Sequence, residues 1–133
     1  MKKRLLITRR LPEAVEVRAN RDYEVVQNED DHQMTTDEVV EKAADVDAIL
    51  ITITDKMRED VILALPEHIK ILSTFSIGYD HIDLAAATER GLPVGHTPGV
   101  LVDTTADTAF ALMLAAGRRV AEADRFVRAG QWR

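Results

Sequence analysis

The sequence contains no cysteine. This absence excludes a disulfide framework, a thiolate nucleophile and a metal site built from cysteines. At 133 residues the chain is long enough to bury one hydrophobic core without such cross-links, so one core domain is expected. The composition suits a reducing compartment, and we expect a cytoplasmic protein.

Long apolar runs and an excess of positive charge are also missing. No stretch reaches the roughly 18 uninterrupted apolar residues of a membrane helix. The apolar run after the basic N-terminus, Leu5 to Ile7, is too short for a secretory signal. The net charge of −6 argues against nucleic-acid binding, which depends on clustered Lys and Arg. We therefore expect a soluble protein without a membrane or nucleic-acid partner.

Ligand-binding signatures are scarce. The glycines stand at positions 78, 91, 95, 99, 117 and 130, so none has the Gly-x-Gly-x-x-Gly spacing of a dinucleotide site, and there is no Walker loop. No two histidines have the helical spacing that would hold a metal, and no metal site is expected. The four histidines are interpreted as surface or capping residues, and only His81, beside Gly78, is of functional interest.

Strand and helix patterns alternate through residues 1–100. Apolar runs predict strands at residues 4–8, 23–26, 47–52, 69–75 and 93–97, with helices at 12–19, 35–44, 58–65 and 83–90 between them. Thr35 and Glu38 form a capping-box signature, Asp83 can cap the fourth helix, and Gly91 is typical of a helix end. The short connections favour right-handed crossovers. We predict a flavodoxin-like, doubly wound α/β fold with a five-stranded parallel sheet of order 2-1-3-4-5, its third strand covered by helices on both faces.

A long amphipathic helix is predicted at residues 103–128, within a separate segment at 101–133. Apolar side chains recur at spacings of three and four, at Ala109, Met113, Ala116, Val120, Ala123 and Val127. On the other side, Glu122 with Arg125 and Asp124 with Arg128 are spaced to pair. Gly117 costs the helix interior about 1 kcal/mol relative to alanine, and close packing against a neighbour would explain it. Because no later element covers the apolar stripe, we expect self-association through this helix.

Five aspartates follow the third, fourth and fifth predicted strands, at positions 55, 80, 83, 103 and 107. Helix capping and turn formation explain most of them. A receiver domain of a phosphorelay shares the fold class, but it requires acidic residues just after the first strand. This sequence has Thr8, Arg9 and Arg10 there, which argues against that function.

The segment around Gly78 has two interpretations. It follows the fourth strand, and ligands of open parallel sheets bind outside the carboxyl ends of the strands. Gly78 is either a turn residue that requires a positive φ, or part of an anion site. In the second case Ser76, Ile77 and Gly78 present backbone N–H groups, with the Ser76 hydroxyl as a further donor, to a carboxylate. Local chemistry slightly favours the turn.

Four stretches carry a specific resemblance. They are Phe75-Ser-Ile-Gly-Tyr-Asp-His-Ile-Asp83, Ala87-Thr-Glu-Arg-Gly91, Thr97-Pro-Gly-Val-Leu-Val-Asp-Thr-Thr-Ala-Asp107 and Ala123-Asp-Arg-Phe-Val-Arg-Ala-Gly-Gln-Trp132. Residues 46–133 thereby resemble the N-terminal part of the D-isomer-specific 2-hydroxyacid dehydrogenases, most closely the glyoxylate and hydroxypyruvate reductase branch. Residues 1–45 match only in pattern.

The resemblance implies roles for individual residues. The loop that matches Ser76, Ile77 and Gly78 binds the carboxylate of a small 2-oxo or 2-hydroxy acid through backbone N–H groups, and Ile77 borders the nicotinamide. Ile53 matches a position that lines the substrate pocket. Val102 and Thr105 match positions that border the NAD or NADP cofactor, and the helix at 103–128 would pack at a homodimer interface.

The same resemblance implies parts that residues 1–133 lack. A Rossmann domain with the glycine fingerprint, a substrate-binding arginine, a carboxylate and the catalytic histidine would follow Trp132, and neither His81 nor His96 matches that histidine. We therefore expect the substrate-binding part of an NAD(P)-dependent oxidoreductase for acids such as glyoxylate, hydroxypyruvate and glycerate. By itself it would be inactive, with no catalytic residue and no tightly bound cofactor. The alternative is a non-catalytic carboxylate-binding or dimerisation module.

Overall fold

The computed structural model describes residues 1–133, which form two compact units, residues 1–98 and 99–133. The first unit contains β1 (Arg4–Ile7), α1 (Glu13–Asp22), β2 (Glu24–Gln27), α2 (Thr36–Ala43), β3 (Ala48–Ile51), α3 (Glu59–Ala64), β4 (Ile71–Thr74), α4 (Leu84–Glu89) and β5 (Val94–Gly95). The second contains α5 (Val102–Gly117) and α6 (Val120–Arg128).

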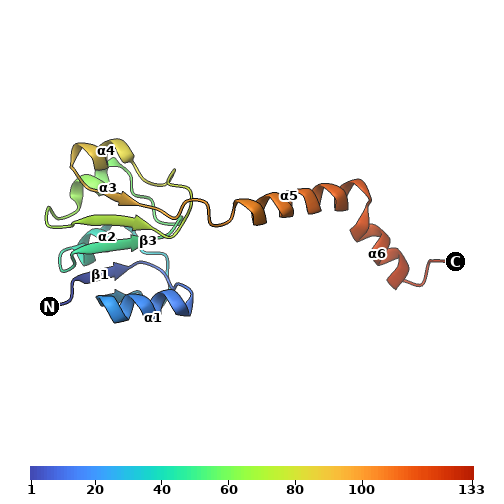
Figure 1. Ribbon diagram of the computed structural model, residues 1–133, viewed down its shortest axis with the longest axis horizontal. Coiled ribbons are helices and arrows are strands. Elements are labelled where there is room, and N and C mark those ends of the chain that lie inside the picture. The colour runs from blue at the N-terminus through green and yellow to red at the C-terminus, as the bar shows by residue number, and fades with distance from the viewer. The chain divides into compact units, whose positions relative to one another are not determined.

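The strands of the first unit form one parallel sheet (Figure 1). Its order is β2-β1-β3-β4-β5, and every neighbouring pair is parallel. This confirms the predicted fold class and strand order. The strands are shorter than predicted, most of all β5, where the pairing with β4 is confined to Val94 and Gly95.

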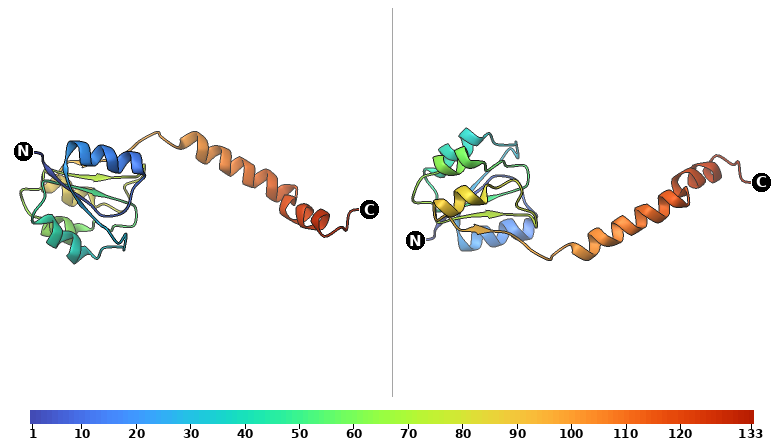
Figure 2. Two further views of the ribbon diagram at one scale, coloured as in Figure 1. Left: turned by 90° about the horizontal axis from the view of Figure 1, so that it is seen from below. Right: turned by 90° about the horizontal axis from the view of Figure 1, so that it is seen from above.

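The helices cover the two faces of the sheet unequally. Figure 2 shows α1 on one face and α2, α3 and α4 on the other. The larger core lies under the three helices, and it contains the inward side chains Leu6, Ile49, Ile51 and Leu72. The smaller core contains Leu5, Ile7 and Ala48 from the opposite face, together with Ala19 of α1. This division follows from the alternation of side chains along each strand.

The face of the sheet under α1 is only partly covered, although helices lie on both faces of the sheet, as predicted (Figure 2). Leu50 of β3 is half-buried, and Ile71 of β4 is 37% exposed. Both line a groove of about 480 Å³ beside α1. A single helix of ten residues shields β1 and β2, and β3 and β4 keep apolar side chains at the surface.

Local signals fix several helix ends as predicted. The Thr35 side chain accepts a hydrogen bond from the Glu38 N–H, and the Glu38 carboxylate accepts one from the Thr35 N–H, so the capping box is complete. The Asp83 carboxylate accepts a hydrogen bond from the Ala86 N–H at 3.0 Å. Gly91 follows α4 with φ +70°, a conformation that costs glycine little.

The second unit contains a long helix, as predicted, but the prediction of one continuous helix over residues 103–128 is wrong. The helix α5 ends at Gly117, and Arg119 takes a left-handed conformation with φ 52°. A left-handed residue just past a helix end is a common terminator, and glycine in the last turn weakens the helix that precedes it. An added Cβ at Gly117 would have no neighbour within 4 Å in this chain, so close packing against a neighbour stays a prediction.

The apolar side chains of this unit also differ from the predicted single stripe. Phe110, Leu112, Met113 and Leu114 are all exposed, and at 100° per residue they point to different sides of α5. Neither α5 nor α6 has a buried residue. The Asp124–Arg128 pair forms at 2.9 Å, whereas Glu122 pairs with Arg119 and not with Arg125. None of the helices is both long enough and apolar enough to span a bilayer.

Candidate functional site

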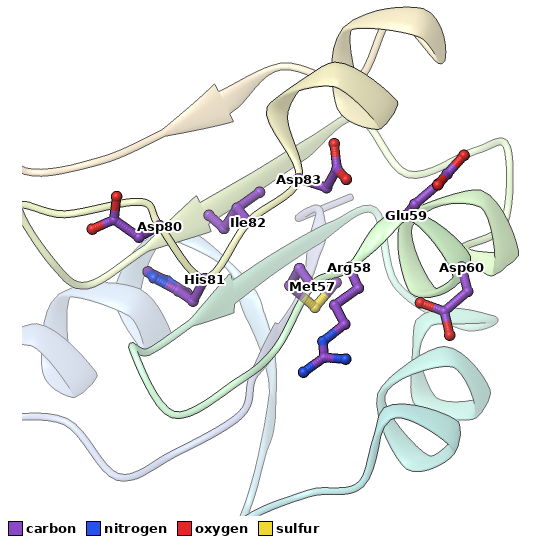
Figure 3. Close-up of a pocket in the computed structure, with 8 residues that line it drawn as sticks. All are labelled: Met57, Arg58, Glu59, Asp60, Asp80, His81, Ile82 and Asp83. Atoms are coloured by element: carbon purple, nitrogen blue, oxygen red, sulfur yellow. The ribbon is translucent and has the colours of Figure 1, made fainter.

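The candidate site lies in the loop between β4 and α4, residues 75–83, at the edge where the parallel strands end. The loop is anchored on the segment that follows β3. The Met57 N–H donates to the His81 carbonyl at 2.9 Å, and the Asp83 N–H donates to the Met57 carbonyl at 2.8 Å. Met57 is almost fully buried, so this side of the loop is held against the core. Figure 3 shows these residues around a pocket of about 580 Å³, with Arg58 to Asp60 at the start of α3.

Three consecutive carbonyls of the loop accept hydrogen bonds. The Ser76 carbonyl accepts from the Thr97 N–H at 3.0 Å, and the Ile77 carbonyl accepts from His96 Nδ1 at 2.8 Å. The Gly78 carbonyl accepts from the Ser76 hydroxyl at 2.7 Å. By contrast, the N–H groups of Ser76, Ile77 and Gly78 make no hydrogen bond within the chain. The loop therefore offers unpaired donors on a backbone whose acceptors are satisfied.

The Ser76 hydroxyl does not have the predicted role of a free anion donor. Its proton is directed to the Gly78 carbonyl, so its contact with Thr74 Oγ1 at 2.7 Å must be one in which Thr74 donates. Thr74 Oγ1 then accepts from His81 Nε2, which lies 2.9 Å away. In the resulting chain of hydrogen bonds His81 donates to Thr74, Thr74 to Ser76 and Ser76 to the Gly78 carbonyl. Nε2 of His81 therefore carries a proton.

His81 titrates in a mixed environment. Burial lowers the pKa of its imidazole below the ordinary value, and the positive charge of Lys56 lowers the pKa further, whereas Asp55 and Asp80 oppose this shift. Figure 3 shows Asp80 and His81 side by side on the loop. The lowered pKa favours the neutral ring, which suits a donor to Thr74.

Gly78 does not need the positive φ that the turn interpretation required. Positive values occur at Gly91, Gly99 and Gly130, but not at Gly78. A Cβ added at Gly78 would meet only Asp80 Oδ2, at 3.5 Å, which is ordinary contact. The turn interpretation is therefore wrong in this structure, and backbone strain does not explain this glycine.

Ile53 and Gly78 line the same pocket. It has a volume of about 330 Å³, and the other lining residues are Lys56, Asp80 and His81. Ile53 is 59% exposed, so its side chain presents an apolar surface beside the unpaired N–H groups. Lys56, which sequence reasoning did not select, brings a positive charge with no carboxylate partner within ion-pair distance. The roles of these residues stay predictions.

The five predicted aspartates do not form a cluster. Asp83 caps α4, Asp80 lines the pocket, and Asp103 and Asp107 lie exposed on α5. Asp55 is buried, and its Oδ2 accepts hydrogen bonds from the Thr8 hydroxyl and the Thr52 N–H, both at 2.8 Å, while its Oδ1 has no partner. No group of three or more acidic or histidine side chains is arranged to hold a metal.

The two predicted cofactor-bordering residues of the second unit lie in the first turn of α5. Val102 and Thr105 are both exposed, and the Thr105 N–H donates to the Leu101 carbonyl at 3.0 Å. Ile77, the third predicted cofactor contact, is half-buried in the loop after β4.

A family-level comparison covers most of the chain. The family described as "D-isomer specific 2-hydroxyacid dehydrogenase, catalytic domain" matches residues 5–126. A glycerate dehydrogenase of Hyphomicrobium methylovorum is 46% identical over 131 residues, which are 98% of this chain and 41% of that protein. A glyoxylate reductase of Thermococcus litoralis is 42% identical over the whole chain and 40% of its own length. The chain thus spans about two fifths of these relatives.

Solved structures agree with this comparison. A 2-hydroxyacid dehydrogenase structure from Polaromonas sp. has a TM-score of 0.84 at 36% identity, over 99% of this chain and 41% of that chain. An NADPH-dependent glyoxylate/hydroxypyruvate reductase from Sinorhizobium meliloti, solved with NADP and malonate, has a TM-score of 0.79 at 28% identity. The match covers 99% of this chain and 40% of that chain.

Proposed function

Because the chain belongs to the D-isomer specific 2-hydroxyacid dehydrogenase family, we propose that it supplies the substrate-binding part of an NAD(P)-dependent oxidoreductase. Its substrates are small 2-oxo or 2-hydroxy acids of the glyoxylate, hydroxypyruvate and glycerate type. The similarity to a glycerate dehydrogenase and a glyoxylate reductase supports this class of substrate. The lack of cysteine fits a cytoplasmic location.

One observation carries the proposal. The N–H groups of Ser76, Ile77 and Gly78 have no partner in the chain, and Gly78 shares a pocket with the apolar side chain of Ile53. Backbone N–H groups that converge on a carboxylate form charge-assisted hydrogen bonds without a cationic side chain. An apolar wall beside them suits the carbon atoms of a small acid.

The cofactor would be bordered and not enclosed by residues 1–133. There is no Gly-x-Gly-x-x-Gly among them, and the proposed contacts are only Ile77, Val102 and Thr105. When bound, the nicotinamide exchanges a hydride with the substrate. Residues 1–133 would position the acid for this exchange, and by themselves they are expected to bind NAD or NADP weakly.

An activity assay tests this proposal. Residues 1–133, mixed with NADH or NADPH and glyoxylate or hydroxypyruvate, should give no sustained oxidation, because no residue among them is assigned the proton transfer. Turnover at an enzyme-like rate would contradict the proposal. A longer polypeptide that adds a dinucleotide-binding domain should be active.

A second function, a carboxylate-binding or dimerisation module, is favoured by two features. The loop N–H groups are unpaired without any cofactor, and α5 and α6 bury no residue. Titration calorimetry with glyoxylate, glycerate and oxalate separates the two functions. Tight binding without cofactor would favour the module, whereas the dehydrogenase part should bind these acids weakly or not at all. Under either function we propose a homodimer through residues 103–128.

A further inference from the structure

The segment that follows β5 contacts the candidate loop on the side of its carbonyl groups. His96 and Thr97 come directly after β5, and both donate hydrogen bonds to carbonyls of the loop after β4. Their partners, the Ile77 and Ser76 carbonyls, belong to the peptide groups that carry the Gly78 and Ile77 N–H groups. We propose that His96 is a positioning residue, which orients the Gly78 N–H toward the substrate carboxylate; this assignment rests on the proposed function.

Peptide geometry connects the two ends of this arrangement. A peptide group is planar, and in the trans form its C=O and N–H bonds point in opposite directions. The chain has no cis peptide bond. Because the Ile77 carbonyl points at His96 Nδ1, 2.8 Å away, the Gly78 N–H points away from His96. Gly78 lines the pocket that also contains Ile53, and its N–H has no partner in the chain.

The contact fixes the tautomer of His96. A carbonyl oxygen only accepts hydrogen bonds, so Nδ1 of His96 must carry a proton. The ring is further located by Tyr79, whose aromatic ring meets it edge to face with centroids 5.4 Å apart. Tyr79 directly follows Gly78 in the loop. The imidazole is therefore held between the peptide it orients and the next side chain.

The hydrogen bond from His96 orients the peptide between Ile77 and Gly78 and also polarises it. Donation to a carbonyl polarises the whole peptide group, and polarised groups in a chain of hydrogen bonds strengthen one another. The Gly78 N–H becomes a stronger donor to an anion on its far side. Thr97 acts in the same way on the Ile77 N–H, but through its own backbone N–H. His96 is the side chain in this pair, so a substitution can test it.

The test uses residues 1–133 labelled with ¹⁵N, with oxalate as the probe for a substrate carboxylate. Amide spectra are recorded without oxalate and during titration to millimolar concentrations, for the wild type and three variants. His96→Ala removes the donor. His96→Asn places an amide N–H₂ near the position of Nδ1 and should restore the contact. His32→Ala is the matched control, because His32 bonds the Glu38 carboxylate in the α2 capping region.

We expect His96→Ala to weaken oxalate binding by about three- to tenfold, the range of one neutral hydrogen bond. Its Gly78 amide proton should also move to lower frequency in the oxalate-free spectrum. His96→Asn should recover most of both effects, and His32→Ala should show neither. If the wild type responds to oxalate and His96→Ala binds equally well with an unmoved Gly78 signal, the assignment of His96 is overturned. If the wild type itself gives no response to oxalate, the carboxylate-binding module is overturned, and the oxalate-free Gly78 signal still decides whether His96 orients this N–H.

Discussion

The two units of this chain treat their apolar side chains in opposite ways. In residues 1–98, Leu6, Ile49, Ile62 and Leu72 are completely buried. In residues 99–133, neither helix has a buried residue, and Phe110, Leu112, Met113 and Leu114 are exposed. Burial of apolar surface is the main favourable contribution to folding. The first unit therefore has a core of its own, whereas the second is expected to depend on a partner surface for its stability.

Truncation of one leucine in each unit should give the largest difference. Leu72→Ala in β4 removes a fully buried side chain, and it should lower the free energy of unfolding by about 2–5 kcal/mol. Leu112→Ala in α5 removes one that is 66% exposed, and it should change this free energy by less than about 0.5 kcal/mol in the monomer. Urea unfolding followed by circular dichroism measures both. Equal losses would show that α5 has a core that we have not recognised.

A charge on α5 should have the next largest effect. Met113→Glu places a carboxylate among exposed apolar side chains, so it should raise the dissociation constant of the proposed homodimer at least about tenfold, as at a central interface residue. Thr88→Glu adds the same charge at an exposed position outside residues 103–128, and it serves as the control. Sedimentation equilibrium reports both constants. A wild-type chain that stays monomeric at high concentration would refute the dimer.

The sequence predicted the first unit well because its signals are local. Apolar runs separated by helix-capping residues fix the order of strands and helices, and short connections restrict the topology. The capping box at Thr35 and the Asp83 cap each involve residues three positions apart. Such contacts depend little on the rest of the fold, so they can be read from the chain directly.

The features that the sequence did not predict depend on backbone conformation or on distant residues. The break between α5 and α6 involves a left-handed backbone conformation at Arg119, which is not a glycine. The helix propensity of arginine does not predict this conformation. Asp55 is buried, and it accepts a hydrogen bond from Thr8, which follows β1 and is 47 positions away in the sequence. The uneven cover of the sheet results from the position of α1, which the order of elements does not determine.

The candidate site shows the same division. The motif around Gly78 selected the loop after β4, whose binding role stays a prediction, and Ile53 lines a pocket with Gly78. The hydrogen bonds that His96 and Thr97 give to the loop carbonyls arise only because β5 lies beside β4. The motif Val94-Gly-His-Thr97 contains the required donors, but nothing in it identifies the carbonyls they contact.

A side-chain cap at a helix end should contribute a smaller difference in the free energy of unfolding. Thr35 caps α2 with its side chain, whereas α5 and α6 have no side-chain cap. Thr35→Ala should lower the free energy of unfolding by about 1 kcal/mol. Thr36→Ala, at the first helical position, keeps the capping oxygen and should have almost no effect. Equal values for the two variants in thermal unfolding would mean that the cap does not stabilise α2.

Exposed ion pairs should give the smallest difference, one that depends on pH. The Arg9 guanidinium and the Arg10 N–H both donate to Asp31, and the Arg9 contact is the main cause that lowers the pKa of this carboxyl to about 2. Because the folded-state pKa lies below the unfolded value of about 3.9, the ionised pair stabilises the fold above about pH 4, and this contribution is lost as the pH falls toward 2. Asp31→Asn tolerates the left-handed backbone at this position, so it should flatten the pH dependence of the melting temperature in that window. If the pH dependence of the melting temperature is the same in Asp31→Asn as in the wild type, the Arg9–Asp31 pair does not stabilise the fold.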